Sequence, residues 1–202
     1  RRFPDQAQMD GVRVPRLGEL LHLVSQPRYA TACLMLELKS DPDFAQDNAV
    51  RERIVSVICR DVRQAKLADR TLLHSFDWAL LAECRRQAPD MPLSFLTQLQ
   101  ENEHDVGEDS SILLTPDFSK PNMSVPDEVS KAGGSLWCPR FTELGADDLA
   151  HARELGLAVA AWTVNEPDDI EAMIDLRVDA IVTDYPGRVQ QRLSERGFRW
   201  RH

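Results

Sequence analysis

The sequence lacks the patterns that mark several large classes of protein. No apolar run approaches the ~18 residues that a membrane-spanning helix needs. Neither GxGxxG nor GxxxxGK occurs, so the glycine-rich turns that bind dinucleotides and nucleoside triphosphates are missing. Basic residues are in the minority, with 24 Lys and Arg against 33 Asp and Glu and a net charge of −9. These features argue against stable membrane insertion and against a nucleic-acid partner.

Cysteine is scarce as well. The four cysteines form no CxxC pair and have no zinc-finger spacing with histidine. Cys33 and Cys59 stand among apolar residues, and we predict that both are thiols of the hydrophobic core. Apolar residues, by contrast, make up 43% of the 202 residues. This is enough for a globular protein with a substantial core.

Short apolar runs alternate with amphipathic stretches along the chain. The runs are rich in β-forming residues and predict strands at 33–38, 71–76, 92–97, 135–139, 157–164 and 179–183. Apolar residues at helical spacing predict helices around 50–62, 78–87, 149–155 and 170–174. Because such alternation is typical of βαβ units, we expect an α/β fold with a parallel sheet.

Polar side chains gather where the predicted strands end. They form four pairs, which are Glu37 and Lys39, Ser75 and Asp77, Thr163 and Asn165, and Thr183 and Asp184. This arrangement is typical of the TIM barrel, whose chemistry lies at the carboxyl ends of its strands. A complete barrel needs about eight strands and ~250 residues, and only five or six strands are predicted. We therefore expect residues 1–202 to form a single, incomplete (β/α)8 barrel, whose first two or three strands lie before Arg1.

Residues 98–134 are the least regular segment of the sequence. The run ENEHDVGEDSS is acidic, and Pro116, Pro121 and Pro126 should interrupt any helix. Because the segment follows a predicted strand, we expect a loop at the catalytic face that could act as a lid. His104 stands among carboxylates in this run, and a solvated acidic loop explains it better than a metal site.

The most informative local pattern is Glu37-Leu38-Lys39. Side chains alternate along a strand, so Glu37 and Lys39 share one face, which in a barrel is the interior. A carboxylate and an ammonium are costly there unless they are paired or used. Either they form an internal ion pair, or Glu37 binds a divalent cation and Lys39 neutralises a phosphate.

Two aromatic residues and one histidine also lie on predicted strands. Trp162 follows two alanines, which suggests that its ring enters a confined space, although such a residue more often belongs to the core. The same holds for Phe76. His74 precedes a strand end and could be a base, but a lone strand histidine is more often a structural residue.

Four motifs occur in order along the chain: ELK at 37–39, HSFDW at 74–78, AWTVNEP at 161–167 and VDAIVTDYP at 178–186. Together they resemble the C-terminal two thirds of bacterial glycerophosphodiester phosphodiesterases. The segments FPDQ…DGVRVPRLGELL at 3–21 and GGSLWCP at 133–139 are similar to one branch of that family. The resemblance covers nearly the whole chain, and it depends on the four motifs being in register rather than on any one of them.

The resemblance implies a TIM barrel of the phospholipase-C-like phosphodiesterase type. Such an enzyme hydrolyses glycerophosphodiesters to glycerol 3-phosphate and an alcohol with the help of Mg²⁺ or Ca²⁺. By motif position, Glu37 would be a metal ligand and Lys39 a catalytic residue that contacts the phosphate. Phe76 and Trp162 would wall the glycerol side of the pocket, and Asn165 would be a further substrate-binding residue.

The sequence also departs from this family. The family's acid and base are histidines of an HRG motif on the first strand and of an HD motif after the third, and two further metal carboxylates come from an E-N-T-like turn and an E-x-D strand. We find none of these motifs at the corresponding places of this chain. The histidines at 22, 74, 104, 151 and 202 do not match them. We therefore expect the acid and the base upstream of this chain, and residues 1–202 alone to be inactive.

Two other functions stay open at this point. The chain could be a non-catalytic truncated barrel that binds phosphate esters or mediates assembly. It could also be a related barrel that acts on phosphoinositides or lysophospholipids. An incomplete barrel exposes strand edges and apolar interior, so association into a homo-oligomer or completion by an upstream segment is expected. The compartment is open between the bacterial cytoplasm and the periplasm.

Overall fold

The computed structural model describes residues 7, 9–43, 45–99, 112, 114–118 and 123–199. Six strands carry the fold: β1 (Leu34–Glu37), β2 (Thr71–Ser75), β3 (Leu93–Thr97), β4 (Leu136–Pro139), β5 (Ala158–Ala161) and β6 (Ala180–Ile181). Seven helices accompany them within the described residues: α1 (Leu17–Val24), α2 (Asn48–Gln64), α3 (Trp78–Gln87), α4 (Val125–Lys131), α5 (Ala146–Glu154), α6 (Pro167–Leu176) and α7 (Pro186–Glu195). The predicted alternation of strands and helices is confirmed.

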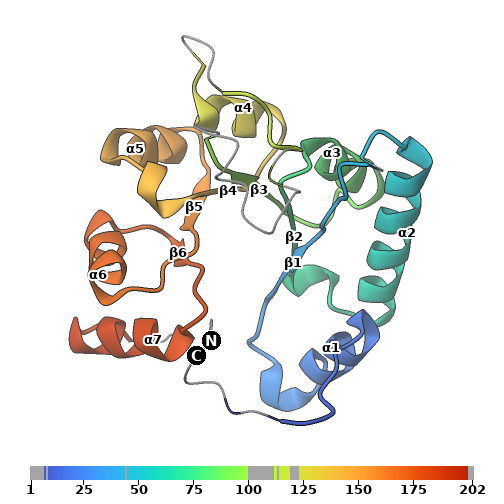
Figure 1. The fold of residues 1–202 in the computed structure, drawn as a ribbon, viewed down its shortest axis with the longest axis horizontal. Coiled ribbons are helices and arrows are strands. Elements are labelled where there is room, and N and C mark those ends of the chain that lie inside the picture. Colours follow the sequence, from blue (N-terminus) through green and yellow to red (C-terminus); the bar gives the residue numbers. More distant parts are fainter. Residues whose placement is uncertain are drawn as a thin grey trace.

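The strands form one parallel sheet in the order β1-β2-β3-β4-β5-β6. Figure 1 shows that this sheet curls into half a barrel and that helices α2 to α7 lie on its outer side. Strands β1 and β6 are its two ends. The predicted α/β fold with a parallel sheet is therefore confirmed, and six curled strands are consistent with a partial TIM barrel.

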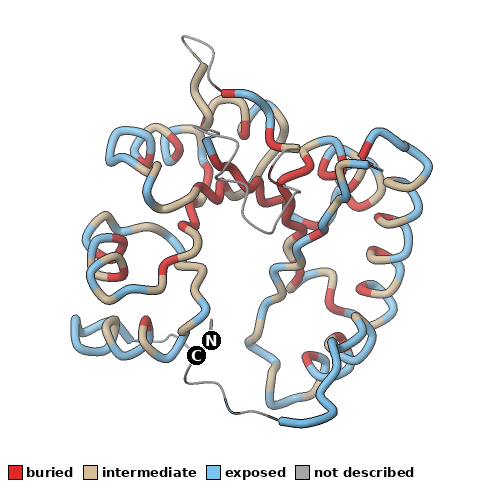
Figure 2. Tube along the Cα trace, in the orientation of Figure 1, coloured by how far each residue is buried: buried red, intermediate tan, exposed pale blue. Residues whose placement is uncertain are grey.

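Burial is deepest in the middle of the sheet and falls toward both ends (Figure 2). All residues of β3 are buried, whereas Met35 and Glu37 of β1 and Ala180 of β6 are exposed. The central strands are covered by helices on the outer side, and their inward-facing side chains pack against one another inside the curl. The end strands lack a neighbour on one side, so their inward-facing side chains stay accessible.

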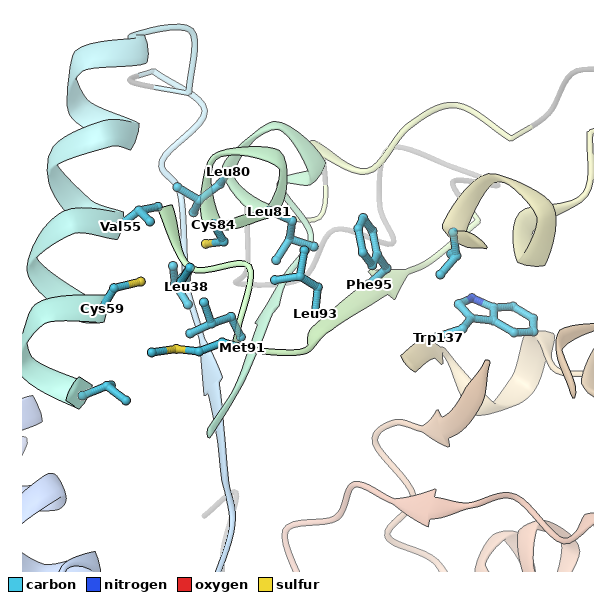
Figure 3. Close-up of a cluster of buried hydrophobic side chains, with 14 of the residues drawn as sticks. Leu38, Val55, Cys59, Leu80, Leu81, Cys84, Met91, Leu93, Phe95 and Trp137 are labelled. Carbon is cyan, nitrogen blue, oxygen red and sulfur yellow. The ribbon is translucent and has the colours of Figure 1, made fainter. Parts of the chain in front are cut away.

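Most of the core lies between the sheet and its helices. Figure 3 shows side chains of this layer, among them Val55 and Cys59 of α2, Leu80 and Leu81 of α3, and Phe95 of β3. The Trp78 and Phe95 rings meet edge to face, with centroids 4.7 Å apart. A second cluster joins β5, α6 and α7, and a third, described below, lies inside the curled sheet.

The prediction that Cys33 is a core thiol is wrong, while Cys59 is buried as predicted. Cys33 directly precedes β1 and is exposed. Its apolar neighbours in the sequence pointed to a core position. However, β1 is an end strand, and no described residue covers this part of its inner face.

The segment at 98–134 contains helix α4, in which Pro126 lies in the first turn. Proline is tolerated there, because the first-turn N–H groups have no partner within the helix. Ser124 caps this helix by accepting a hydrogen bond from the Asp127 N–H at 3.3 Å. His104 and most of the acidic run lie outside the described residues, so the predicted lid stays a prediction. In the part of the chain that is described, no helix is long and apolar enough to cross a membrane.

Candidate active site at the carboxyl ends of the strands

The predicted pair Glu37 and Lys39 lies at the carboxyl end of β1. The Lys39 Nζ donates a hydrogen bond to the Glu37 Oε1 at 2.8 Å. The Lys39 side chain is 56% exposed and the Glu37 side chain 33% exposed, so both charges are open to a ligand. The two side chains share a face, as the strand alternation predicts. They form an ion pair, which was one of the two interpretations of the Glu37-Leu38-Lys39 pattern.

A short set of hydrogen bonds fixes the chain around Lys39. The buried Ser75 hydroxyl donates to the Leu38 carbonyl at 2.6 Å. One residue after Lys39, the Ser40 hydroxyl donates to the Asp77 carboxylate at 2.8 Å. Asp77 also caps α3, because its carboxylate accepts from the Leu80 N–H at 3.0 Å. The polar residues at the end of β2 thus position the strand end that carries Lys39. An aspartate directly before a helix signals this cap in the sequence, but the contact with Ser40 has no local signal.

His74 is the register partner of Glu37 on the neighbouring strand. It is 5% exposed, and its Nδ1 lies 2.7 Å from the Ser94 Oγ of β3. Burial lowers the pKa of His74 to about 4, and the nearby Lys39 charge acts in the same direction. The imidazole is therefore neutral at pH 7, and a buried, hydrogen-bonded ring fits the structural role better than that of a base.

Phe76 and Trp162 meet inside the curled sheet although they are far apart in the sequence. Their ring centroids are 5.3 Å apart with an interplanar angle of 82°, an edge-to-face contact. The Trp162 Nε1–H donates to the Cys138 carbonyl at 2.9 Å, which fixes the indole against the end of β4. Leu96, Cys138 and Ala160 pack below the two rings. The structure thus brings the two aromatic residues together as one wall.

Asn165 belongs to a network that joins the loops after β5 and β6. Its Oδ1 accepts from the Thr183 hydroxyl at 3.1 Å and from the Asp184 N–H at 3.0 Å. Its Nδ2 donates to the Asp184 carboxylate at 2.9 Å, and its carbonyl accepts from the Arg188 guanidinium at 2.8 Å. The sequence motifs identified Asn165 and Asp184, and the structure shows that they hold each other.

The described residues do not fit a divalent cation by themselves. Within them, no group of three or more His, Cys, Asp or Glu side chains lies close enough together to hold a metal ion. Glu37, the predicted ligand, is paired with Lys39. Because Mg²⁺ and Ca²⁺ take several oxygen ligands, this one carboxylate would bind either ion weakly.

The sequence model of the glycerophosphoryl diester phosphodiesterase family matches residues 1–188. The chain belongs to this family. This is the family that the four sequence motifs resembled, so that prediction is confirmed.

Individual relatives agree with this membership. A candidate glycerophosphoryl diester phosphodiesterase of Silicibacter pomeroyi DSS-3, whose structure is solved, is 49% identical with a TM-score of 0.88, over 99% of this chain and 63% of that one. The uncharacterized protein YqiK of Bacillus subtilis is 25% identical over 192 residues, 94% of this chain and 66% of that protein. A phosphodiesterase of Oleispira antarctica, described in complex with the product sn-glycerol-3-phosphate, has the same fold at 16% identity, with a TM-score of 0.67 over 89% of this chain and 61% of that one. The chain thus spans less than two thirds of the length of each of these three relatives.

Proposed function

We propose that this protein hydrolyses glycerophosphodiesters to glycerol 3-phosphate and an alcohol. The observation that carries the proposal is the family match over residues 1–188. The geometry supports it, because an accessible Lys39–Glu37 pair stands at the same rim as a wall made of Phe76 and Trp162. A glycerophosphodiester joins an anionic phosphate to a glycerol group, whose C–H groups can pack against an aromatic face, so both kinds of surface suit it.

Each site residue has a role in this proposal. Lys39 supplies positive charge to the phosphoryl oxygens, where negative charge grows as the diester is attacked. Phe76 and Trp162 wall the glycerol side of the pocket. Asn165 contacts the substrate through the second N–H of its amide, while its other amide groups hold Asp184 and Thr183.

A divalent cation, Mg²⁺ or Ca²⁺, is part of the proposal, with Glu37 as one of its ligands. When bound, such an ion would act as a Lewis acid on the phosphoryl group. Since the described residues do not form a complete cation site, we place the other ligands of the ion outside the described residues. The five histidines of the sequence do not match the positions of the family's two catalytic histidines, so we place the acid and the base outside residues 1–202. The proposed enzyme is a barrel of the phospholipase-C-like phosphodiesterase type.

The proposal predicts a simple assay result. We expect the longest natural form of the protein that contains these residues to release glycerol 3-phosphate from glycerophosphocholine, and EDTA to abolish the release. We expect residues 1–202 alone to release none, because their histidines do not match the family's acid and base and the described residues form no complete cation site. Lysophosphatidylcholine and a phosphoinositide, assayed in parallel, distinguish the related barrel activities.

Three results would contradict parts of this account. If the longest form hydrolyses none of these diesters, the enzymatic proposal is wrong. If EDTA leaves the activity unchanged, the divalent cation is wrong. If residues 1–202 alone are active, the acid and the base lie within this chain, and His74 and His104 must be reconsidered. Binding of glycerol 3-phosphate without hydrolysis would favour the non-catalytic barrel, which the incomplete cation site also favours.

We also propose that residues 1–202, prepared alone, associate with each other. The sheet ends on β1 and β6, and unpaired strand edges present backbone groups to other chains. An apolar groove of about 870 Å³ adjoins β6, with Ile181, Val189 and Phe198 among its lining residues. Sedimentation velocity over a range of concentrations measures this association directly. A monomer at all concentrations would contradict it.

A further inference from the structure

Arg140 lies at the carboxyl end of β4, and none of the sequence motifs indicated it. It directly follows β4, and it forms an isolated parallel bridge with Trp162 after β5. Its N–H donates to the Thr97 carbonyl at 3.1 Å, and the next N–H, of Phe141, donates to the Trp162 carbonyl at 2.9 Å. The ladder of β4 therefore continues through Arg140 with its two neighbouring strands.

This continuation determines the direction of the Arg140 side chain. Side chains alternate between the faces of a strand, and Cys138, two residues earlier, packs in the cluster inside the curled sheet. Arg140 lies on the same inward face, one step nearer the carboxyl end. It is also on the face of its bridge partner Trp162, whose indole donates to the Cys138 carbonyl at 2.9 Å. The Arg140 side chain thus projects from the same face of the sheet as Trp162, at the carboxyl ends of the strands.

The charges at the mouth favour an anion at Arg140. The Lys39 Nζ lies 2.8 Å from the Glu37 Oε1, so the opposite charges of the two side chains largely cancel. Arg140 is only partly exposed, and its guanidinium has no ion pair or hydrogen bond within the described parts of the chain. Partly buried positive charge without a carboxylate partner is unfavourable in a free protein and becomes favourable when an anion binds.

We propose that Arg140 is a second phosphate-binding cation of the active site, which acts opposite Lys39 and beside Trp162. This inference depends on the proposed function, because it assigns a residue to the substrate of that same site. A guanidinium presents several N–H donors in one plane, and it can bind two phosphate oxygens at once. Lys39 and Arg140 would then hold the phosphate between β1 and β4, with the aromatic wall on one side.

The test measures binding and turnover on the same samples. Calorimetry gives the Kd of sn-glycerol 3-phosphate for the longest natural form of the protein, unchanged and with Arg140→Gln, Arg140→Lys or Arg53→Gln. Arg53 is the matched control, because it is exposed on the outer helix α2 and has no partner among the described residues. Uncharged glycerol serves as the second ligand, and hydrolysis of glycerophosphocholine is measured in parallel.

We expect Arg140→Gln to raise the Kd of glycerol 3-phosphate by about 10- to 100-fold, the loss typical of hydrogen bonds to a charged group. Arg140→Lys should raise it less, Arg53→Gln should leave it unchanged, and none of the variants should alter glycerol binding. A Kd for Arg140→Gln that equals that of Arg53→Gln overturns the inference. An unchanged protein that binds the phosphate but hydrolyses nothing overturns the proposed function instead, and the binding comparison still decides the role of Arg140.

Discussion

The variant Lys39→Gln is expected to lower kcat/KM for glycerophosphocholine by about 100-fold or more, the usual cost of removing a group that stabilises transition-state charge. Glutamine keeps most of the side-chain length but removes the positive charge. The loss should fall mainly on kcat, because negative charge on the phosphoryl oxygens is greatest in the transition state. Steady-state kinetics on the longest natural form of the protein measure this.

The chain offers a matched control for this variant. Lys131 and Glu128 form an ion pair of 2.7 Å on α4, with side chains 70% and 35% exposed, similar to Lys39 and Glu37. Lys131→Gln should leave kcat/KM unchanged. Exposed pairs of this kind contribute only about 0–1 kcal/mol to folding, so both variants should fold. If Lys39→Gln has the same kcat/KM as Lys131→Gln, Lys39 has no role in catalysis, and Glu37 and Lys39 form only a structural ion pair.

Glu37→Gln adds a second arm to the same experiment. It removes the carboxylate charge while it keeps the shape and the hydrogen-bonding atoms of the side chain. If Glu37 binds a cation, this variant needs a higher metal concentration for half-maximal activity. If Glu37 only pairs with Lys39, the metal dependence stays the same while the charge at the mouth becomes more positive.

Acid is expected to destabilise the protein through His74, by about 3 kcal/mol between pH 6.5 and pH 4. The pKa of His74 is about 4 in the folded protein, below the ordinary histidine value of 6.5, because burial disfavours its charged form. As the pH falls through this window, the unfolded chain takes up a proton on His74 before the folded chain does. The contribution is therefore fully present above pH 6.5 and is lost as the pH falls toward 4.

Chemical denaturation at several pH values measures this effect. The variant His74→Gln should show a smaller fall in the free energy of unfolding between pH 6.5 and pH 4 than the unchanged protein. His22→Gln, on an exposed face of α1, removes a histidine without changing the core and serves as the control. Asp127 raises the pKa of His151, so His151 makes the folded protein more stable, not less, as the pH falls. The informative quantity is therefore the difference in pH dependence between the unchanged protein and His74→Gln, in which the effect of His151 cancels. Parallel pH curves for the unchanged protein and His74→Gln would contradict the prediction.

The two charged groups assigned to the phosphate act at different positions in the sheet. Lys39 follows the end strand β1 and is held by hydrogen bonds around Ser40 and Ser75. Arg140 follows the central strand β4 and is held by the ladder with β3 and β5. An anion bound between them would link an end of the half-barrel to its middle.

The sequence by itself determined the α/β class, the order of the elements and several of their bounds. Helix α3 (Trp78–Gln87) begins and ends at the predicted residues, because Asp77 caps it and Pro89 follows it closely. Local propensity and periodicity are enough for such elements. The motif order also identified the family, and strand alternation placed Glu37 and Lys39 on one face.

Only the tertiary structure decided which side chains meet and which stay exposed. Periodicity assigns a residue to a face, but the curl of the sheet brings Phe76 of one loop against Trp162 of another. The position of a strand in the sheet also matters, since Cys33 is exposed because β1 is an end strand. Arg140 became a site residue through its bridge to Trp162, a contact between strands that no local sequence pattern encodes.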